Sequence, residues 1–354
     1  MKTKILIDLT DLSNLSCGFG QIASNYIKNH ELFKLDNVEF IFLIPAHCEI
    51  ELPDLSCKHI KVYKIYRIFS FLLPKVDIWH ATNQLSRYLR LTKSTKFILT
   101  IHDVNFLYEK SARNAARKSK KLQKKIDRAD IITSISNYAA EDIRKNFDLK
   151  GKKIDTIYNG VERIDQNPAL KPNFIKTDRP FFFTIGQIRR KKNFHILLDV
   201  MKNFPEYDLY ISGQDHFAYA QEIKESINRD EINNVFVTGK IKDEEKVWMY
   251  KYCSAFFFPS TLEGFGLPVI EAMQFGKTVF SSDSTSLPEI CQNHAILWKS
   301  MDPQYMSNTI KQYLHDHREE SHIIAKMKEY AYSFSYKRHI QQYINIYAKL
   351  SKSF

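Results

Sequence analysis

The chain has 354 residues, of which 44% are hydrophobic and 26% charged, and its formal net charge is +12. This length exceeds one typical core, so two domains are expected, and the composition is that of a soluble globular protein. The five cysteines are scattered and form no CxxC pair, which argues against a disulfide framework or a zinc module and favours a reducing compartment. The longest apolar runs are far too short to span a bilayer and no signal peptide is visible, so we expect a cytoplasmic location.

Short apolar runs alternate with longer amphipathic stretches in the first part of the chain. The runs KILIDL, VEFIFLI, DIWHAT, KFILTIHD and ADIITSIS are predicted to be strands, each followed by a more polar segment. Alternation of this kind is typical of a parallel sheet covered by helices. We therefore predict a Rossmann-like, doubly wound α/β domain over residues 1–165.

The positive charge is concentrated in this part of the chain. Residues 1–165 hold 28 Lys and Arg against 19 Asp and Glu, and Lys110–Arg128 alone holds nine basic residues and one acidic residue. Such a segment is either a solvated helix face or a binding surface for anionic lipid, to which each Lys or Arg contributes about 1 kcal/mol. Nucleic acid is not expected as a partner, because the segment has no aromatic residues that could stack on bases.

The alternation lapses over residues 166–179, where prolines are frequent, and we predict a linker there. A second series of strands follows: PFFFTIG, YDLYISG, NVFVTG, AFFFPS and TVFSSD. Each of them ends in small or polar residues, as expected where the strands of an open α/β sheet end at a ligand crevice. Residues 180–335 are therefore predicted to form a second Rossmann-like domain.

The segment PSTLEGFGLPVIEAM (259–273) predicts a strand end, a turn and a helix. Pro268 suits the first position of the helix, and Gly276 can cap its end. The helix start would then offer N–H groups and a positive dipole end to an anion. Glu271 is expected in the first helical turn, and Glu263 in the loop before it.

The two carboxylates of this segment are thus not expected to share a helix face. That arrangement does not suggest the acid and base pair of a glycosidase. It suggests an anion bound at the helix start and a diol held by Glu271, which are the features of a nucleoside diphosphate and its ribose.

With seven residues between Glu263 and Glu271, the segment resembles the E-x7-E signature of retaining glycosyltransferases of family 4, which have the GT-B fold. Other segments resemble the same family in the same order: CGFGQIASNYI, TIHDVNFLYE, SISNYAAEDI, IYNGVE, IGQIRRKKNF, VFVTGKIKDEE and FSYKRHIQQYINIY. The resemblance implies two facing Rossmann-like domains. It also implies that the C-terminal helix, residues 336–354, crosses back to the N-terminal domain.

The resemblance assigns roles around the donor. Glu271 would bind the ribose hydroxyls, Glu263 would lie near the donor sugar, and Lys192 would pair with the diphosphate and stabilise its charge as it leaves. Backbone N–H groups for sugar and diphosphate would come from three consecutive residues: Phe265, Gly266 and Leu267. The segment from Gly239 to Ile241 would line the base.

Three further residues are implied on the N-terminal domain. Gly18 and Gly20 would let a loop close over the same phosphates, although taken alone such glycines more often form a structural turn. His102 would contact the sugar, although taken alone it is an ordinary histidine at a strand end. The implied catalytic residues are then Glu263, Lys192 and His102.

One position departs from the family pattern. Many relatives have arginine directly after the glycine of the IGQIRRKKNF loop, whereas this chain has Gln187. Either Arg189 or Arg190 would then supply the missing charge, or the phosphate clamp is weaker.

The implied function is that of a retaining hexosyltransferase in bacterial surface polysaccharide or lipopolysaccharide synthesis. It would move a sugar from a UDP- or GDP-sugar to a saccharide or lipid-linked acceptor, without a cofactor and as a peripheral protein at the inner face of the plasma membrane. No D-x-D motif occurs in the sequence, so no essential metal is expected. The alternatives are a nucleotide-sugar epimerase of the same fold and a non-catalytic relative that binds an anionic surface.

Overall fold

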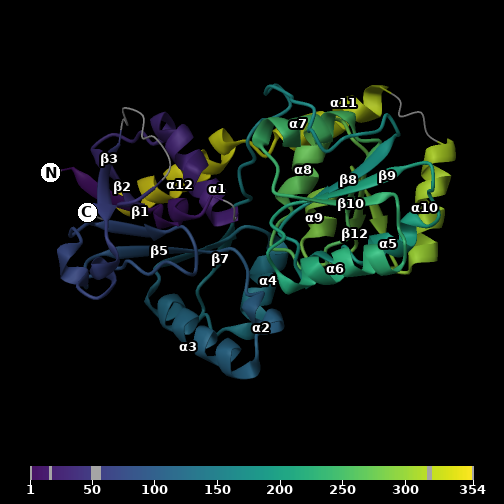
Figure 1. Cartoon of the computed structure of the whole chain (residues 1–354). Coiled ribbons are helices and arrows are strands. Elements are labelled where there is room, and N and C mark those ends of the chain that lie inside the picture. The colour runs from purple at the N-terminus through teal and green to yellow at the C-terminus, as the bar shows by residue number, and fades with distance from the viewer. Residues whose placement is uncertain (1, 16–17, 49–56, 317–320, 353–354) are drawn as a thin grey trace. The chain divides into compact units, whose positions relative to one another are not determined.

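The computed structural model describes residues 2–15, 18–48, 57–316 and 321–352. The chain divides into two compact units, each with its own parallel sheet and its own core (Figure 1). Unit 1 comprises Met1–Glu162 and Phe334–Phe354, and unit 2 comprises Arg163–Ser333.

Unit 1 is built on a seven-stranded sheet with the order β3-β2-β1-β4-β5-β6-β7. The strands are β1 (Thr3–Asp8), β2 (Val38–Pro45), β3 (Lys58–Val62), β4 (Ile78–Ala81), β5 (Lys96–Ile101), β6 (Ile131–Ser134) and β7 (Ile154–Thr156). The α-helices are α1 (Gly18–Lys28), α2 (Phe106–Glu109), α3 (Ala112–Arg128), α4 (Asn137–Asn146) and α12 (Tyr336–Ser351). Short 3-10 helices are η1 (Thr10–Ser13), η2 (His30–Leu32), η3 (Lys64–Arg67) and η4 (Ser70–Leu72).

Alternating side chains of β1 show why both faces of this sheet are covered. Ile5 and Ile7 pack in a cluster with residues of α1 and α12, whereas Leu6 packs in another with Leu122 and Ile126 of α3. A strand that is apolar on both faces is expected in a parallel sheet with helices on both sides. In the register of the parallel strands, Ile7 lies opposite Phe42 of β2 and His80 of β4.

The C-terminal helix α12 belongs to unit 1, and Figure 1 shows it in yellow among the N-terminal elements. Its Tyr347 hydroxyl lies 2.7 Å from Nδ1 of His80, and its Tyr343 hydroxyl lies 2.9 Å from Oγ1 of Thr100. His339 contacts the hydroxyl of Tyr26 on α1 at 2.8 Å. Buried polar groups are costly unless they are paired, so these contacts specify how α12 sits on the sheet.

Unit 2 has a six-stranded sheet with the order β10-β9-β8-β11-β12-β13. The strands are β8 (Phe181–Ile185), β9 (Asp208–Ser212), β10 (Val235–Gly239), β11 (Ala255–Phe258), β12 (Val279–Ser282) and β13 (Ile296–Trp298). The helices are η5 (Arg190–Lys192), α5 (Ile196–Met201), α6 (Ala218–Arg229), α7 (Asp243–Tyr252), α8 (Leu267–Gln274), α9 (Leu287–Cys291), α10 (Pro303–Asp316) and α11 (Ser321–Tyr332). Phe182 packs with residues of α5 and α10 on one face, while Phe183 contacts Tyr250 of α7 on the other.

Strand order in unit 2 reverses between β8 and β11. In open parallel sheets a ligand crevice forms outside the carboxyl ends of the two strands at such a reversal. The segments that follow β8 and β11 contain Lys192 and Glu263 respectively, so the topology places both sequence-predicted residues at the expected crevice. Among the described residues, none of the helices combines the length and apolar character needed to cross a bilayer.

Candidate active site

Lys192 closes the short helix η5 in the segment after β8, and its side chain turns into the unit. Only 11% of that side chain is exposed, and its ammonium lies 4.7 Å from the ring centroid of Phe258 at the end of β11. Gly186 makes room for it, because a Cβ at that position would lie 3.0 Å from Cε of Lys192. The loop therefore delivers one cation to the carboxyl ends of β8 and β11.

Glu263 is the direct partner of this cation. Its Oε1 lies 2.5 Å from Nζ of Lys192 and accepts a second hydrogen bond from the Ser260 hydroxyl at 2.6 Å. Burial by itself would raise the pKa of Glu263, but the charges of Lys192 and Lys191 and these hydrogen bonds outweigh it, and the net effect lowers the pKa. Glu263 is thus held as a carboxylate.

The loop that carries Glu263 is fixed by hydroxyl groups from the segment after β12. The backbone N–H of Glu263 donates to Oγ1 of Thr285 at 3.0 Å. The Ser286 hydroxyl donates to the carbonyl oxygens of Glu263 and Phe265, each at 3.1 Å. These contacts define the backbone just before α8, so the carboxylate is positioned by its loop as well as by Lys192.

The start of α8 requires glycine at its N-cap. Gly266 has φ +115°, and a Cβ there would lie 2.8 Å from Cδ2 of Leu287. The first turn of a helix leaves N–H groups without partners inside the helix, and its dipole favours an anion. Phe265 is only 3% exposed, so its ring is buried in the unit, and its backbone leads into the helix start. The expected cap at the other end is confirmed, because Gly276 follows α8 with φ +67°.

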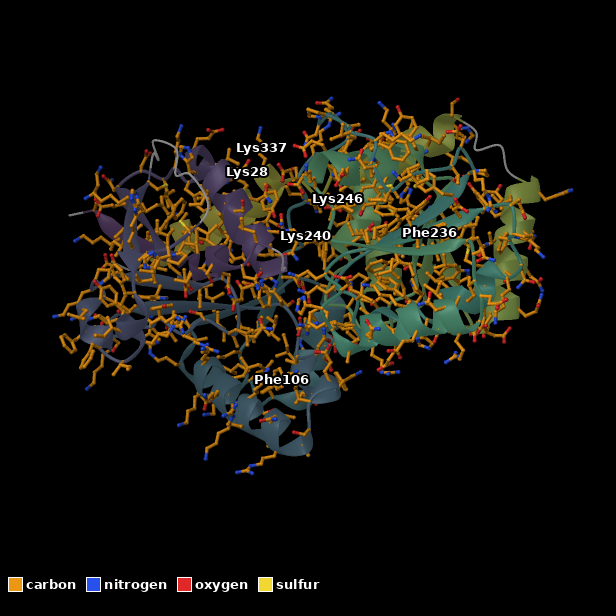
Figure 2. The ribbon with its side chains drawn as sticks, viewed as in Figure 1. Lys28, Phe106, Phe236, Lys240, Lys246 and Lys337 are labelled. Atoms are coloured by element: carbon orange, nitrogen blue, oxygen red, sulfur yellow. The ribbon has the colours of Figure 1, made fainter. Side chains whose placement is uncertain are left out.

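The expectation for Glu271 is wrong in one respect. The helix begins at Leu267, one residue before Pro268, so Glu271 is its fifth residue and lies in the second turn. There it accepts hydrogen bonds from two residues of α7, Lys246 at 3.2 Å and the Tyr250 hydroxyl at 2.8 Å. Figure 2 labels Lys246. Packing of α7 beside α8 thus orients the carboxylate, which remains 18% exposed.

Neither Gln187 nor the two arginines of the loop after β8 pair with Glu263. Gln187 donates to the side-chain oxygen of Gln214 at 3.0 Å, and the guanidinium of Arg189 lies over the ring of Phe217 at 4.1 Å. Arg190, with 71% of its side chain exposed, forms an ion pair with Glu222 of α6. The structure therefore brings Lys192, but neither arginine, to Glu263.

Gly239 and Ile241 lie beside the same sheet, at the end of β10 and just after it. Gly239 has φ +72°, and its carbonyl oxygen accepts the N–H of Gly213 at 2.8 Å. A Cβ on Gly239 would lie 3.7 Å from the carboxylate oxygens of Asp215, which pairs with Lys224. Ile241 is partly exposed in the segment that leads to α7.

In unit 1 the structure brings His102 and the glycine segment together. The ring of Phe19, between Gly18 and Gly20, meets the His102 ring edge-on with 4.7 Å between centroids. Both glycines lie in the first turn of α1 rather than in a loop before it. A Cβ on Gly20 would lie 1.9 Å from the carbonyl oxygen of Asn14, whereas Gly18 has nothing within 4 Å of that position.

His102 is buried and neutral. Burial lowers its pKa to about 4, despite its hydrogen bond to a backbone carbonyl. Nε2 lies 2.8 Å from the carbonyl oxygen of Thr82, which can only accept, so Nε2 carries the proton and Nδ1 is left as an acceptor. A neutral imidazole of this kind can accept a hydrogen bond from a hydroxyl group.

Several residues of the site were missed by sequence reasoning. Four of them act through Glu263 or Glu271: Ser260, Thr285, Lys246 and Tyr250. Phe19 was missed too. Only Ser260 had a sequence signal, since it ends an apolar strand at the predicted crevice.

Two family models match the chain in succession. The model described as Glycosyltransferase Family 4 matches residues 51–163, and the model described as Glycosyl transferases group 1 matches residues 165–334. The chain belongs to the family 4 glycosyltransferases. The predicted family and the predicted GT-B fold are both confirmed.

Curated relatives of this glycosyltransferase include proteins named as mannosyltransferases. The Serotype-specific mannosyltransferase WbdA of Escherichia coli is 26% identical over 230 residues, which are 58% of this chain. Those residues are only 28% of WbdA, so the chain spans about a quarter of that relative. The O-antigen chain mannosyltransferase B of Escherichia coli is 26% identical over 72% of this chain and 70% of its own length.

Solved structures share the fold over the whole chain. Sucrose-phosphate synthase from Thermosynechococcus elongatus superposes with a TM-score of 0.76 at 18% identity and covers 100% of both chains. Anabaena HepE, solved in complex with UDP-glucose, has a TM-score of 0.71 at 17% identity and covers 98% of this chain and 99% of its own.

Proposed function

We propose that this glycosyltransferase moves a hexose, with mannose as the first candidate, from a nucleoside-diphosphate sugar to a saccharide or lipid-linked acceptor with retention of configuration. The observation that carries the proposal is the Lys192–Glu263 pair at the reversal of strand order in unit 2, with Glu263 four residues before the start of α8. Mannose is favoured because curated relatives are named mannosyltransferases. Two of these names include the O-antigen chain, which also favours a role in bacterial surface polysaccharide synthesis.

The proposed chemistry uses the charges of the site. The bond from the anomeric carbon to the phosphate oxygen breaks, and the ammonium of Lys192 and the start of α8 stabilise the charge that develops on the leaving diphosphate. An acceptor hydroxyl forms the new bond on the same face of the sugar, and its proton passes to the departing phosphate. Glu263 binds sugar hydroxyls, and Glu271, held by α7, binds the ribose.

Roles for unit 1 and metal independence belong to the same proposal. Gly18 and Gly20 of α1 would bind phosphates of the donor, and neutral His102 would contact its sugar. Since the leaving charge is met by Lys192 and a helix start, no metal bridge is required. UDP and GDP both remain candidates for the nucleotide.

A membrane role is proposed for α3. Five of its basic side chains are exposed: Arg113, Arg117, Lys120, Lys121 and Lys124. Lys125 and Arg128 of the same helix instead bind backbone carbonyl oxygens of residues 84–95, so they hold the helix in place. The exposed set would attract an anionic lipid surface that presents the acceptor.

The test is release of nucleotide from UDP-, GDP- and ADP-sugars in the presence of chelator and a lipid-linked acceptor, for the wild type and Glu271→Ala. The proposal predicts release of one nucleotide, loss of that release in the variant, and a product whose anomeric configuration matches the donor by NMR. Activity lost in chelator and restored by manganese would overturn metal independence. Conversion of a donor sugar without any acceptor would favour an epimerase.

A further inference from the structure

The segment from Tyr63 to Leu72, here called the apolar segment, exposes large hydrophobic side chains. Six of its ten residues are between 43% and 78% exposed: Tyr63, Ile65, Ile68, Phe69, Phe71 and Leu72. Ile68 is the most exposed, at 78%. Hydrophobic side chains scattered singly are normal on a protein surface, but such a concentration marks an interaction site.

The apolar segment is held in place by its ends and by Arg90. Val62 before it and Leu73 after it are 2% and 1% exposed and belong to the core of unit 1. The guanidinium of Arg90 donates to the carbonyl oxygens of Phe71 and Leu73. The backbone is thus anchored in two 3-10 turns, η3 and η4, while the side chains between the anchors stay outside the core.

The charge around the apolar segment is of one sign. Residues 57–76 contain five Lys and Arg and no Asp or Glu. All five basic side chains are exposed: Lys58, Lys61, Lys64, Arg67 and Lys75. Lys58 pairs with Glu39 of β2. The guanidinium of Arg67 also lies 4.9 Å from the ring centroid of Tyr88, so it is fixed at the border of the apolar surface.

This combination fits the boundary between lipid headgroups and acyl chains. Short apolar segments with aromatic residues and a basic border lie in that boundary, where the rings enter the hydrocarbon edge and the cations meet anionic headgroups. The ten residues are far too short to span a bilayer. In Figure 1 the segment is the dark blue region that follows β3.

We propose that the apolar segment inserts into the headgroup region of an anionic bilayer and anchors unit 1 there. This goes beyond the electrostatic surface proposed for α3, because the exposed residues of α3 are charged and those of the apolar segment enter the lipid. It is also independent of the proposed transferase activity, since none of its residues belongs to the candidate active site. Residues 84–95 connect the two surfaces. Arg90 in this stretch donates to Phe71 of the apolar segment, and Gln84 accepts a hydrogen bond from Lys125 of α3.

The experiment is sedimentation of the full chain with vesicles of phosphatidylcholine, with and without phosphatidylglycerol. The test variant is Ile68→Ser/Phe71→Ser. The control is Leu170→Ser/Ile323→Ser, which removes two exposed apolar side chains, 53% and 46% exposed, from unit 2. A third variant, Lys120→Gln/Lys121→Gln/Lys124→Gln, removes charge from α3 alone.

We expect the wild type and the control to bind anionic vesicles equally, and the Ile68→Ser/Phe71→Ser variant to bind at least ten-fold more weakly at every salt concentration. The α3 variant should lose binding mainly at low salt. All variants should keep the wild-type melting temperature, because the removed side chains are exposed. Vesicle binding of the Ile68→Ser/Phe71→Ser variant equal to the wild type would overturn the proposal. So would absence of wild-type binding together with a dimer that this variant abolishes, since the segment would then bind a second copy of the chain.

Discussion

The ammonium of Lys192 and the carboxylate of Glu263 lie 2.5 Å apart although 71 residues separate them in the chain. Their side chains are 11% and 14% exposed, so the pair is largely withdrawn from water. A diphosphate that entered this crevice would meet Lys192 already neutralised by Glu263. When the donor binds, the ammonium must therefore interact with both the diphosphate and the Glu263 carboxylate. The carboxylate can then turn towards the hydroxyls of the sugar.

The first prediction concerns this pair. Lys192→Ala leaves a mostly buried carboxylate without its main partner, and breaking a buried ion pair from one side costs roughly 3 kcal/mol of unfolding free energy. Adding Glu263→Gln removes the unpaired charge, so the double variant should recover part of that loss. Urea denaturation of the wild type, both single variants and the double variant measures the coupling. Strictly additive effects would show that the pair does not stabilise unit 2.

Glu271 should be more important for binding than for folding. Glu271→Gln keeps the shape and the contact with Tyr250 but removes the charge, so we expect the Kd for the nucleotide to rise at least ten-fold with little change in melting temperature. Tyr250→Phe removes the hydroxyl that donates to the carboxylate and to the carbonyl oxygen of Pro268, and its effect should be smaller and in the same direction. Isothermal titration with the nucleoside diphosphate measures both. A Tyr250→Phe effect that exceeds that of Glu271→Gln would assign Tyr250 a direct role.

The two glycines of α1 should differ sharply. Gly20→Ala places a Cβ 1.9 Å from the Asn14 carbonyl oxygen, and forcing extra volume into a packed site costs about 1–3 kcal/mol. Gly18→Ala is the matched control, because nothing lies within 4 Å of its Cβ position and alanine favours a helix by up to ~1 kcal/mol. Thermal unfolding compares them. Equal destabilisation by both substitutions would contradict the packing described here.

Three buried histidines predict acid sensitivity of unit 1. Burial lowers the pKa of His102 and His339 to about 4 and that of His80 to about 3, whereas the unfolded chain has the ordinary value of 6.5. Between pH 4 and pH 6.5 the unfolded state binds more protons than the folded state. The free energy of unfolding should therefore be highest above pH 6.5 and fall as the pH drops towards 4. Denaturation at several pH values measures the slope, which His102→Gln should reduce. A stability that is flat from pH 7 to 5 would contradict the burial of these rings.

Most strands of the two sheets were predictable from sequence, but the edge strand β3 was not. The apolar runs that became β1, β2, β4, β8 and β11 are buried on both faces, so hydrophobicity alone located them. The edge strand β3 was missed, because only Val62 of its five residues is buried and two of the others are lysines. No helix separates β4 from β5, where a helix had been expected from the alternation.

The site was predictable as a set of residues but not as a set of contacts. The spacing of Glu263 and Glu271 and the basic loop around Lys192 follow from local sequence. Pairing of Lys192 with Glu263 depends on two distant loops that meet where strand order reverses, and orientation of Glu271 depends on α7, so neither has a local signal. The exposure of residues 63–72 was not predicted either, because their apolar residues are of the types that usually lie in a core.

The most direct test of the account is the affinity of the chain for the nucleoside diphosphate released in the donor assay, measured by titration calorimetry for the wild type, Lys192→Ala and Lys202→Ala. Lys202 is the control, since it is an exposed lysine that pairs with Asp199 away from the site. The account predicts at least a ten-fold loss of affinity in Lys192→Ala and no change in Lys202→Ala. Wild-type affinity in a folded Lys192→Ala variant would contradict the claim that Lys192 binds the diphosphate.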